Sequence, residues 1–177
     1  MRFDQWVPDI LPDVPGCPDA MVEREVRRSA IAFCRDTLCW IERLDPITPE
    51  AGKLAYDLWL PREASLVQVY ECAIGHKVAL PDQIVFDVSP DDAVIIDVAL
   101  APSINSETVP DHVAEQWYEA IASGAKYRLM EVPTRTWSNP QMAAHHRMLY
   151  TQMVHSARVR RSKSFGATPL RTRTFGI

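Results

Sequence analysis

The chain has 177 residues, 47% of them hydrophobic and 24% charged, which is an ordinary composition for a globular protein. No apolar run approaches the roughly 20 residues that cross a bilayer, and the first 16 residues have no apolar core, so we expect neither a membrane contact nor a signal peptide. The formal net charge is only −4, from 19 basic and 23 acidic residues.

Residues 1–17 are predicted to form an extended N-terminal arm. Prolines and a glycine interrupt this stretch and disfavour a regular helix: Pro8, Pro12, Pro15 and Gly16. Trp6 and Ile10 are apolar, so we expect the arm to lie against a surface of this chain or of a neighbour.

A first helix is predicted from Pro18 to about Asp45. Apolar residues recur there every three or four positions, and acidic residues follow Pro18 at the positive end of the helix dipole. Asp45-Pro46 is expected to end it. The cysteines at 17, 34, 39 and 72 lack metal-binding spacing and are predicted to be free thiols.

Residues 47–102 change to an alternating pattern, which predicts strands. Turn signals at Pro61-Arg62-Glu63, Gly75-His76 and Ser89-Pro90 separate the apolar runs. We therefore expect an antiparallel β-meander of about five strands, inserted between helices as a small subdomain. The predicted strands are residues 54–60, 65–74, 77–80, 84–88 and 93–100.

Two more helices are predicted, over 111–130 and 139–162, each opened by a capping residue and a proline. Residues 18–46 and 103–162 would form the helical domain. The sequence thus predicts an α+β fold: a small bundle of three main helices, the inserted β-meander and an extended basic C-terminal tail over 163–177.

The end of the chain is strongly basic. No acidic residue follows Glu131, and residues 132–177 carry eight Lys or Arg, whereas residues 1–131 hold 11 bases and all 23 acids. Such an asymmetry indicates an acidic partner, either nucleic acid or the surface of a neighbouring protein, including a second copy. A solvated extension is the plainer interpretation. Arginine outnumbers lysine seven to one, which favours bidentate docking to carboxylate or phosphate. The predicted docking residues are Arg158, Arg160, Arg161, Lys163, Phe165, Leu170, Arg171, Arg173, Phe175 and Ile177.

Other chemistry is not indicated. His145, His146 and His155 do not share one helix face, so we interpret them as solvated or capping residues and expect no metal. No nucleophile elbow, phosphate-binding loop or dinucleotide fingerprint is present. We therefore expect neither an enzyme nor a cofactor.

The chain resembles the head-to-tail adaptor (connector) proteins of tailed bacteriophages. The resemblance spans most of the length and is carried by the order of five segments. These are PDVPGCPDAMVEREVRRSAIAFCRDT, YDLWLP, AEQWYEAIASGAKYRLMEVP, WSNP and ARVRRSKSFGATPLRTR.

The resemblance implies a structural virion protein, made in the host cytoplasm and located in the neck between capsid and tail. Twelve copies would form a ring under the portal, with a tail or nozzle protein on the other side, and DNA would pass through without specific binding. Residues 158–177 would dock to the portal, and the third helix would form part of the ring wall. The alternative is a nucleic-acid-binding protein that grips phosphate with its basic arm. A third interpretation is an α+β domain without a ligand.

Overall fold

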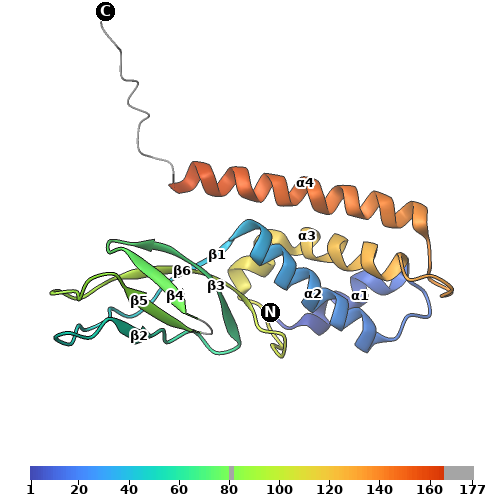
Figure 1. Cartoon of the computed structure of the whole chain (residues 1–177). Coiled ribbons are helices and arrows are strands. Elements are labelled where there is room, and N and C mark those ends of the chain that lie inside the picture. The colour runs from blue at the N-terminus through green and yellow to red at the C-terminus, as the bar shows by residue number, and fades with distance from the viewer. Residues whose placement is uncertain (80–81, 166–177) are drawn as a thin grey trace, which may run out of the picture.

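The computed structural model describes residues 1–79 and 82–165, with side chains through Ser162. Its fold is α+β, with four α-helices and two small antiparallel sheets within the described residues. The helices lie at one end of the molecule and the sheets at the other (Figure 1). The helices are α1 (Val7–Ile10), α2 (Asp19–Thr37), α3 (Asp111–Met130) and α4 (Pro140–Phe165).

The N-terminal segment is helical, so the prediction of an extended arm is wrong. Two 3-10 turns, Phe3–Trp6 and Leu11–Asp13, flank α1. Pro8 and Pro12 occupy first-turn positions, where a missing N–H costs nothing. Trp6 is fully buried, stacks on Tyr118 with ring centroids 4.9 Å apart, and donates from Nε1 to the Tyr118 carbonyl at 3.3 Å. The segment is therefore part of the core of its own chain.

α2 ends at Thr37, eight residues before the predicted end at Asp45. Leu38 takes the left-handed conformation (φ 52°) and its N–H donates to the Cys34 carbonyl at 2.8 Å, which closes the helix. Glycine usually occupies this position, so the sequence carried no stop signal there. The chain continues as β1 (Trp40–Arg43), which pairs with β6.

The strands are short, and their order is not that of a meander. They are β1 (Trp40–Arg43), β2 (Ala55–Asp57), β3 (Ala64–Cys72), β4 (His76–Ala79), β5 (Gln83–Phe86) and β6 (Ile96–Pro102). One sheet has the order β1-β6-β3 and the other β2-β5-β4, so β4 and β5 form the only pair of strands consecutive in sequence among those described. The predicted β-meander is wrong in topology, because β6 returns between β1 and β3.

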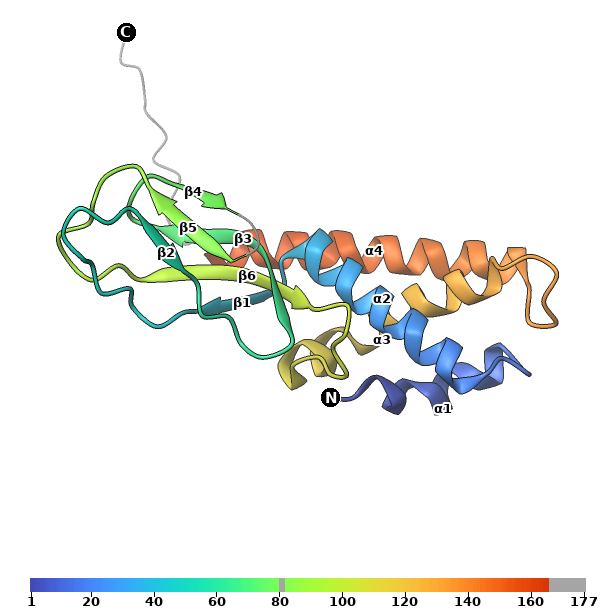
Figure 2. The same ribbon diagram turned by 60° about the horizontal axis from the view of Figure 1, so that its bottom comes forward.

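One apolar core joins the helices to both sheets, since Ile84 and Phe86 of β5 also belong to it. Val22 and Val26 of α2 pack in the same buried cluster as Ile96, Val98 and Leu100 of β6. The β2-β5-β4 sheet lies beyond, at the end of the molecule away from α1 (Figure 2).

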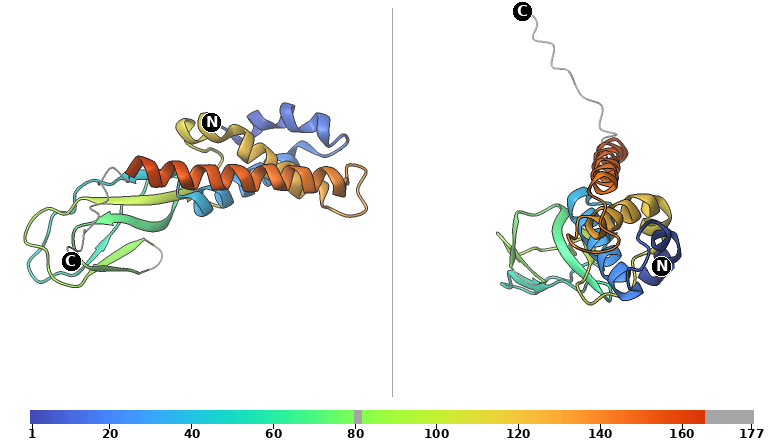
Figure 3. Two further views of the ribbon diagram at one scale, coloured as in Figure 1. Left: turned by 90° about the horizontal axis from the view of Figure 1, so that it is seen from above. Right: turned by 90° about the vertical axis from the view of Figure 1, so that its right-hand side faces the viewer.

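α4 lies along one side of the bundle, over α3 and α2, as the end-on view shows (Figure 3). A second apolar cluster fixes it there. Phe33 of α2 meets Tyr150 of α4 with centroids 6.1 Å apart, and Ala120 of α3 completes the contact. The face of α4 that points away from the bundle is exposed. Between residues 141 and 156, Arg147 is the one charged residue among the exposed positions of this helix.

Candidate functional site

The candidate site is the C-terminal end of α4, where three of the predicted docking arginines lie together. Arg158 Nε donates to the Asp36 carbonyl at 2.7 Å, and Arg161 Nη1 donates to the Thr37 carbonyl at 3.1 Å. These two carbonyls belong to the last turn of α2, where backbone acceptors are left without helical partners and the helix dipole is negative. Two guanidinium groups of α4 therefore cap α2.

Arg160 lies beside α3. With the Gln116 amide turned so that its oxygen faces Arg160, that oxygen accepts from Nη1 at 2.6 Å and from Nε at 3.3 Å. The three arginines thus fasten α4 to two other helices. The acceptors of Arg158 and Arg161 are backbone carbonyls, and since a neutral acceptor does not cancel a cation, the positive charge of these two side chains stays available to an external anion.

Some other cations of the chain are neutralised by a carboxylate within it. Lys126 pairs with Asp13 at 2.6 Å, Arg43 with Asp97 at 2.8 Å, and Arg147 with Glu131 at 3.5 Å. Within residues 1–79 and 82–165, neither Arg158 nor Arg161 forms an ion pair with a carboxylate.

A pocket of about 280 Å³ opens at this end of α4. Trp117 and Ile41 contribute apolar walls, and Arg160 and Arg161 contribute charge. Trp117 departs from helical geometry (φ −124°, ψ 23°), which kinks α3 beside the pocket. The full lining is Leu38, Cys39, Ile41, Gln116, Trp117, Ala157, Arg160 and Arg161.

Sequence reasoning found the arginines but missed the residues they meet. Gln116 and Trp117 lie in the middle of a predicted helix, and only the fold brings them to α4. The rest of the predicted docking set is not placed. Lys163 and Phe165 fall within the bounds of α4, but their side chains lie outside the described part, as do Leu170, Arg171, Arg173, Phe175 and Ile177 entirely.

The histidine prediction needs one correction, because His146 is not solvated. Both of its ring nitrogens are buried without a hydrogen-bond partner among the described residues, and burial together with the nearby Lys126 lowers its pKa below 6.5. Its ring lies 5.5 Å from that of His145. In the described part of the chain, no three His, Cys, Asp or Glu side chains gather as a metal site would require.

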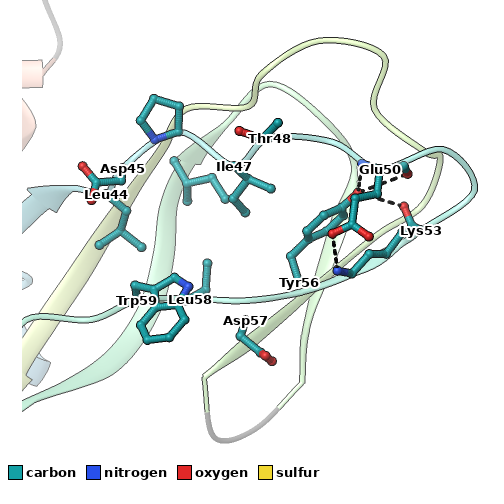
Figure 4. Close-up of a pocket in the computed structure, with 12 residues that line it drawn as sticks. Leu44, Asp45, Ile47, Thr48, Glu50, Lys53, Tyr56, Asp57, Leu58 and Trp59 are labelled. Carbon is teal, nitrogen blue, oxygen red and sulfur yellow. Dashed lines mark hydrogen bonds and ion pairs between the residues drawn. The ribbon is translucent and has the colours of Figure 1, made fainter.

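A second pocket, of about 370 Å³, lies at the far end of the sheets (Figure 4). Tyr56 lines it; the Tyr56 hydroxyl accepts from the Glu50 N–H at 2.9 Å, and Lys53 pairs with Glu50 at 2.7 Å. Leu44, Ile47, Leu58 and Trp59 supply apolar surface.

The sequence matches no protein-family model and no curated protein. None of the helices in the described residues has both the length and the apolar character needed to traverse a bilayer.

Proposed function

We propose that this protein is a head-to-tail adaptor of a tailed bacteriophage, a structural virion component that forms a ring between the portal and the tail and lets the genome pass. The proposal starts from the sequence resemblance. One structural observation supports it. Carbonyls of α2 hold Arg158 and Arg161 in place, and no carboxylate among the described residues neutralises either side chain. An acidic partner protein would supply the missing carboxylates.

The exposed face of α4 supports association between copies. Protein interfaces are depleted of charged side chains at their centre and enriched in methionine and aromatic residues. Between residues 141 and 156 the exposed positions of α4 carry one charged residue, Arg147, and two methionines, Met148, which is 51% exposed, and Met142, which is 39% exposed. A ring in which such faces meet neighbouring subunits repeats the same contact at every step, so weak contacts add up to a stable assembly.

The basic segment beyond α4 is the proposed attachment to the portal. Residues 163–177 carry Lys163, Arg171 and Arg173, no acidic residue, and apolar anchors at Leu170, Phe175 and Ile177. A segment of this composition suits a partner surface that offers both carboxylates and apolar contacts.

The experiment deletes residues 164–177 and measures attachment to purified portal rings of the same phage. We expect attachment to be lost while the monomer unfolds at an unchanged denaturant concentration, because residues up to 157 already form both apolar clusters. Portal binding by the truncated chain at full strength would contradict the assignment of this segment.

A nucleic-acid-binding protein is the second candidate, favoured by the same guanidinium groups, which suit phosphate as well as carboxylate. The two differ in salt dependence. Phosphate contacts release counterions, so the affinity for random duplex DNA would fall by orders of magnitude between about 50 and 200 mM salt. An adaptor whose arginines face protein should bind such DNA weakly at every salt concentration.

A further inference from the structure

Two of the cysteines lie next to each other at the end of α2. Cys34 belongs to the last turn of the helix and Cys39 follows the turn that closes it, and their sulfur atoms lie 3.9 Å apart and share a hydrogen bond. Cys34 is fully buried, whereas Cys39 is partly buried and lines the pocket beside α4. Within the described part of the chain, Cys17 and Cys72 have no such thiol neighbour. Cys34 and Cys39 are therefore placed for chemistry that an isolated thiol cannot perform.

The two adjacent thiols differ in reactivity. The pKa of Cys39 is lowered, chiefly because its sulfur is hydrogen-bonded to Cys34, with burial opposing this effect and Thr37 adding to it. The same hydrogen bond, together with burial, raises the pKa of Cys34. The thiolate is the nucleophile in thiol–disulfide exchange. Cys39 is therefore the thiol that reacts first with a reagent, and Cys34 is the thiol that attacks the product.

The turn between the two cysteines contains the acceptors that hold α4. Leu38 has a left-handed backbone (φ 52°), which turns the chain back on the end of α2. The Asp36 and Thr37 carbonyls, which lie between the two cysteines in sequence, accept hydrogen bonds from Arg158 and Arg161. A bond between the two sulfurs would therefore close a loop around the carbonyls that fix the C-terminal end of α4.

We propose that Cys34 and Cys39 form a redox pair, which a low-molecular-weight disulfide such as oxidised glutathione converts to a disulfide across the end of α2. The Cys39 thiolate attacks one sulfur of the reagent, forms a mixed disulfide and expels one glutathione thiolate. Cys34 then loses its proton and attacks the Cys39 sulfur, which expels the second glutathione thiolate. The two protein thiols lose two electrons to the reagent, and their two protons end on the two glutathione thiolates.

The disulfide would act on the proposed docking site. It restrains the loop that contains the Asp36 and Thr37 carbonyls, so oxidation should hold the C-terminal end of α4 more firmly. Thiols stay reduced in a cytoplasm and are oxidised outside the cell. An adaptor would therefore assemble in the dithiol form and carry the disulfide in the released particle. This last step rests on the proposed function, whereas the chemistry of the pair does not.

The first test treats the folded, full-length protein with oxidised glutathione. Trypsin cuts after Arg35, between the two cysteines, so a disulfide would join the peptides 29–35 and 36–43. We expect mass spectrometry to find these two peptides joined, and alkylation of the denatured protein to label only the other two cysteines. Absence of this linkage, or a linkage that forms only after urea has unfolded the chain, would overturn the proposal.

Two single variants separate the roles of the two thiols. C34A lacks the second nucleophile and should accumulate the mixed disulfide of glutathione with Cys39. C39S should leave Cys34 as a free thiol, since that residue is fully buried whereas Cys39 lines a pocket. Glutathione attached to Cys34 in folded C39S would contradict this order of reaction.

Limited proteolysis measures the coupling to α4. Trypsin also cuts after Arg158 and Arg161, and cleavage within a helix requires local unfolding. Oxidation of the parent should slow these two cleavages several-fold and raise the melting temperature by several degrees, whereas C34A/C39S should respond to glutathione in neither measurement. Equal cleavage of the oxidised and reduced parent, or a lower melting temperature after oxidation, would overturn the coupling. If the pair oxidises as described and no ring forms on the portal, the adaptor function fails while the redox pair stands.

Discussion

The crossing of the three long helices at Gly124 gives the sharpest test of the packing. A methyl group built on Gly124 of α3 would overlap Oγ of Ser29 on α2 and lie 2.9 Å from two ring carbons of Tyr150 on α4. Ser29 is fully buried and the Tyr150 ring packs against Phe33 and Tyr127. Neither neighbour has room to move, so Gly124→Ala should separate the helices.

The expected size follows from two opposing effects. Overpacking a well-packed core costs typically about 1–3 kcal/mol. Replacing glycine by alanine inside a helix otherwise gains up to about 1 kcal/mol. Because the clash involves two other helices at once, the steric cost should dominate. We expect G124A to lose about 1–2 kcal/mol of unfolding free energy and to melt several degrees lower.

Urea unfolding of the parent, S29A, G124A and S29A/G124A measures this directly. Among the described residues Ser29 Oγ has no hydrogen-bond partner, so S29A alone should be neutral or slightly stabilising. It should also relieve part of the G124A loss, since it removes the atom that the new methyl group would overlap. A G124A protein as stable as the parent would refute the close packing of α2, α3 and α4.

Three further predictions concern the N-terminal segment and two titrating groups. W6A should cost about 3–5 kcal/mol in urea unfolding, because Trp6 is fully buried, whereas W59A should cost almost nothing; equal losses would contradict the assigned burial. Burial and Lys126 lower the pKa of His146 below 6.5, with His145 adding to the effect and Asp13 opposing it, so the neutral form is favoured in the folded state. Stability should therefore be complete above about pH 6.5 and fall as the pH drops below it. H146N should flatten this fall, and the exposed control H145N should flatten it much less, since His145 is the smallest of these contributions. Arg43 holds the pKa of Asp97 below its usual value, so the ion pair between β1 and β6 should stabilise the fold fully above the usual pKa of an aspartate, and this contribution should be lost as the pH falls through the lowered pKa. D97N should remove this part of the acid sensitivity of unfolding. An unchanged loss of stability in acid would contradict the ion pair.

Local patterns predicted the long helices well, because their signals are local. α3 has the predicted bounds of 111–130, and α4 begins at Pro140, one residue after the predicted start. The end of α2 was missed because Leu38 adopts a conformation that glycine normally signals. The N-terminal prolines argue against a long helix, but they allow very short ones, in which Pro8 and Pro12 occupy the first turns.

Strand order was beyond local reasoning. The alternation near Trp59 correctly set it apart from the buried Tyr56 and Leu58, and so carried a signal of its exposure. That β6 pairs with β1 and β3, and β5 with β2, depends on contacts between residues distant in sequence. The candidate site, too, was only partly predictable from the sequence. The arginines were visible as a charge asymmetry, whereas Gln116, Trp117 and the end of α2 join them only through the packing of α4.

Electron microscopy of the full-length protein, alone and mixed with purified portal rings from the same genome, tests the adaptor proposal most directly. The proposal predicts closed rings of this chain stacked coaxially on the portal, and portal without such rings when residues 164–177 are deleted. Isolated monomers that do not bind the portal, and that instead bind random duplex DNA and dissociate from it as the salt concentration rises, would contradict the adaptor proposal.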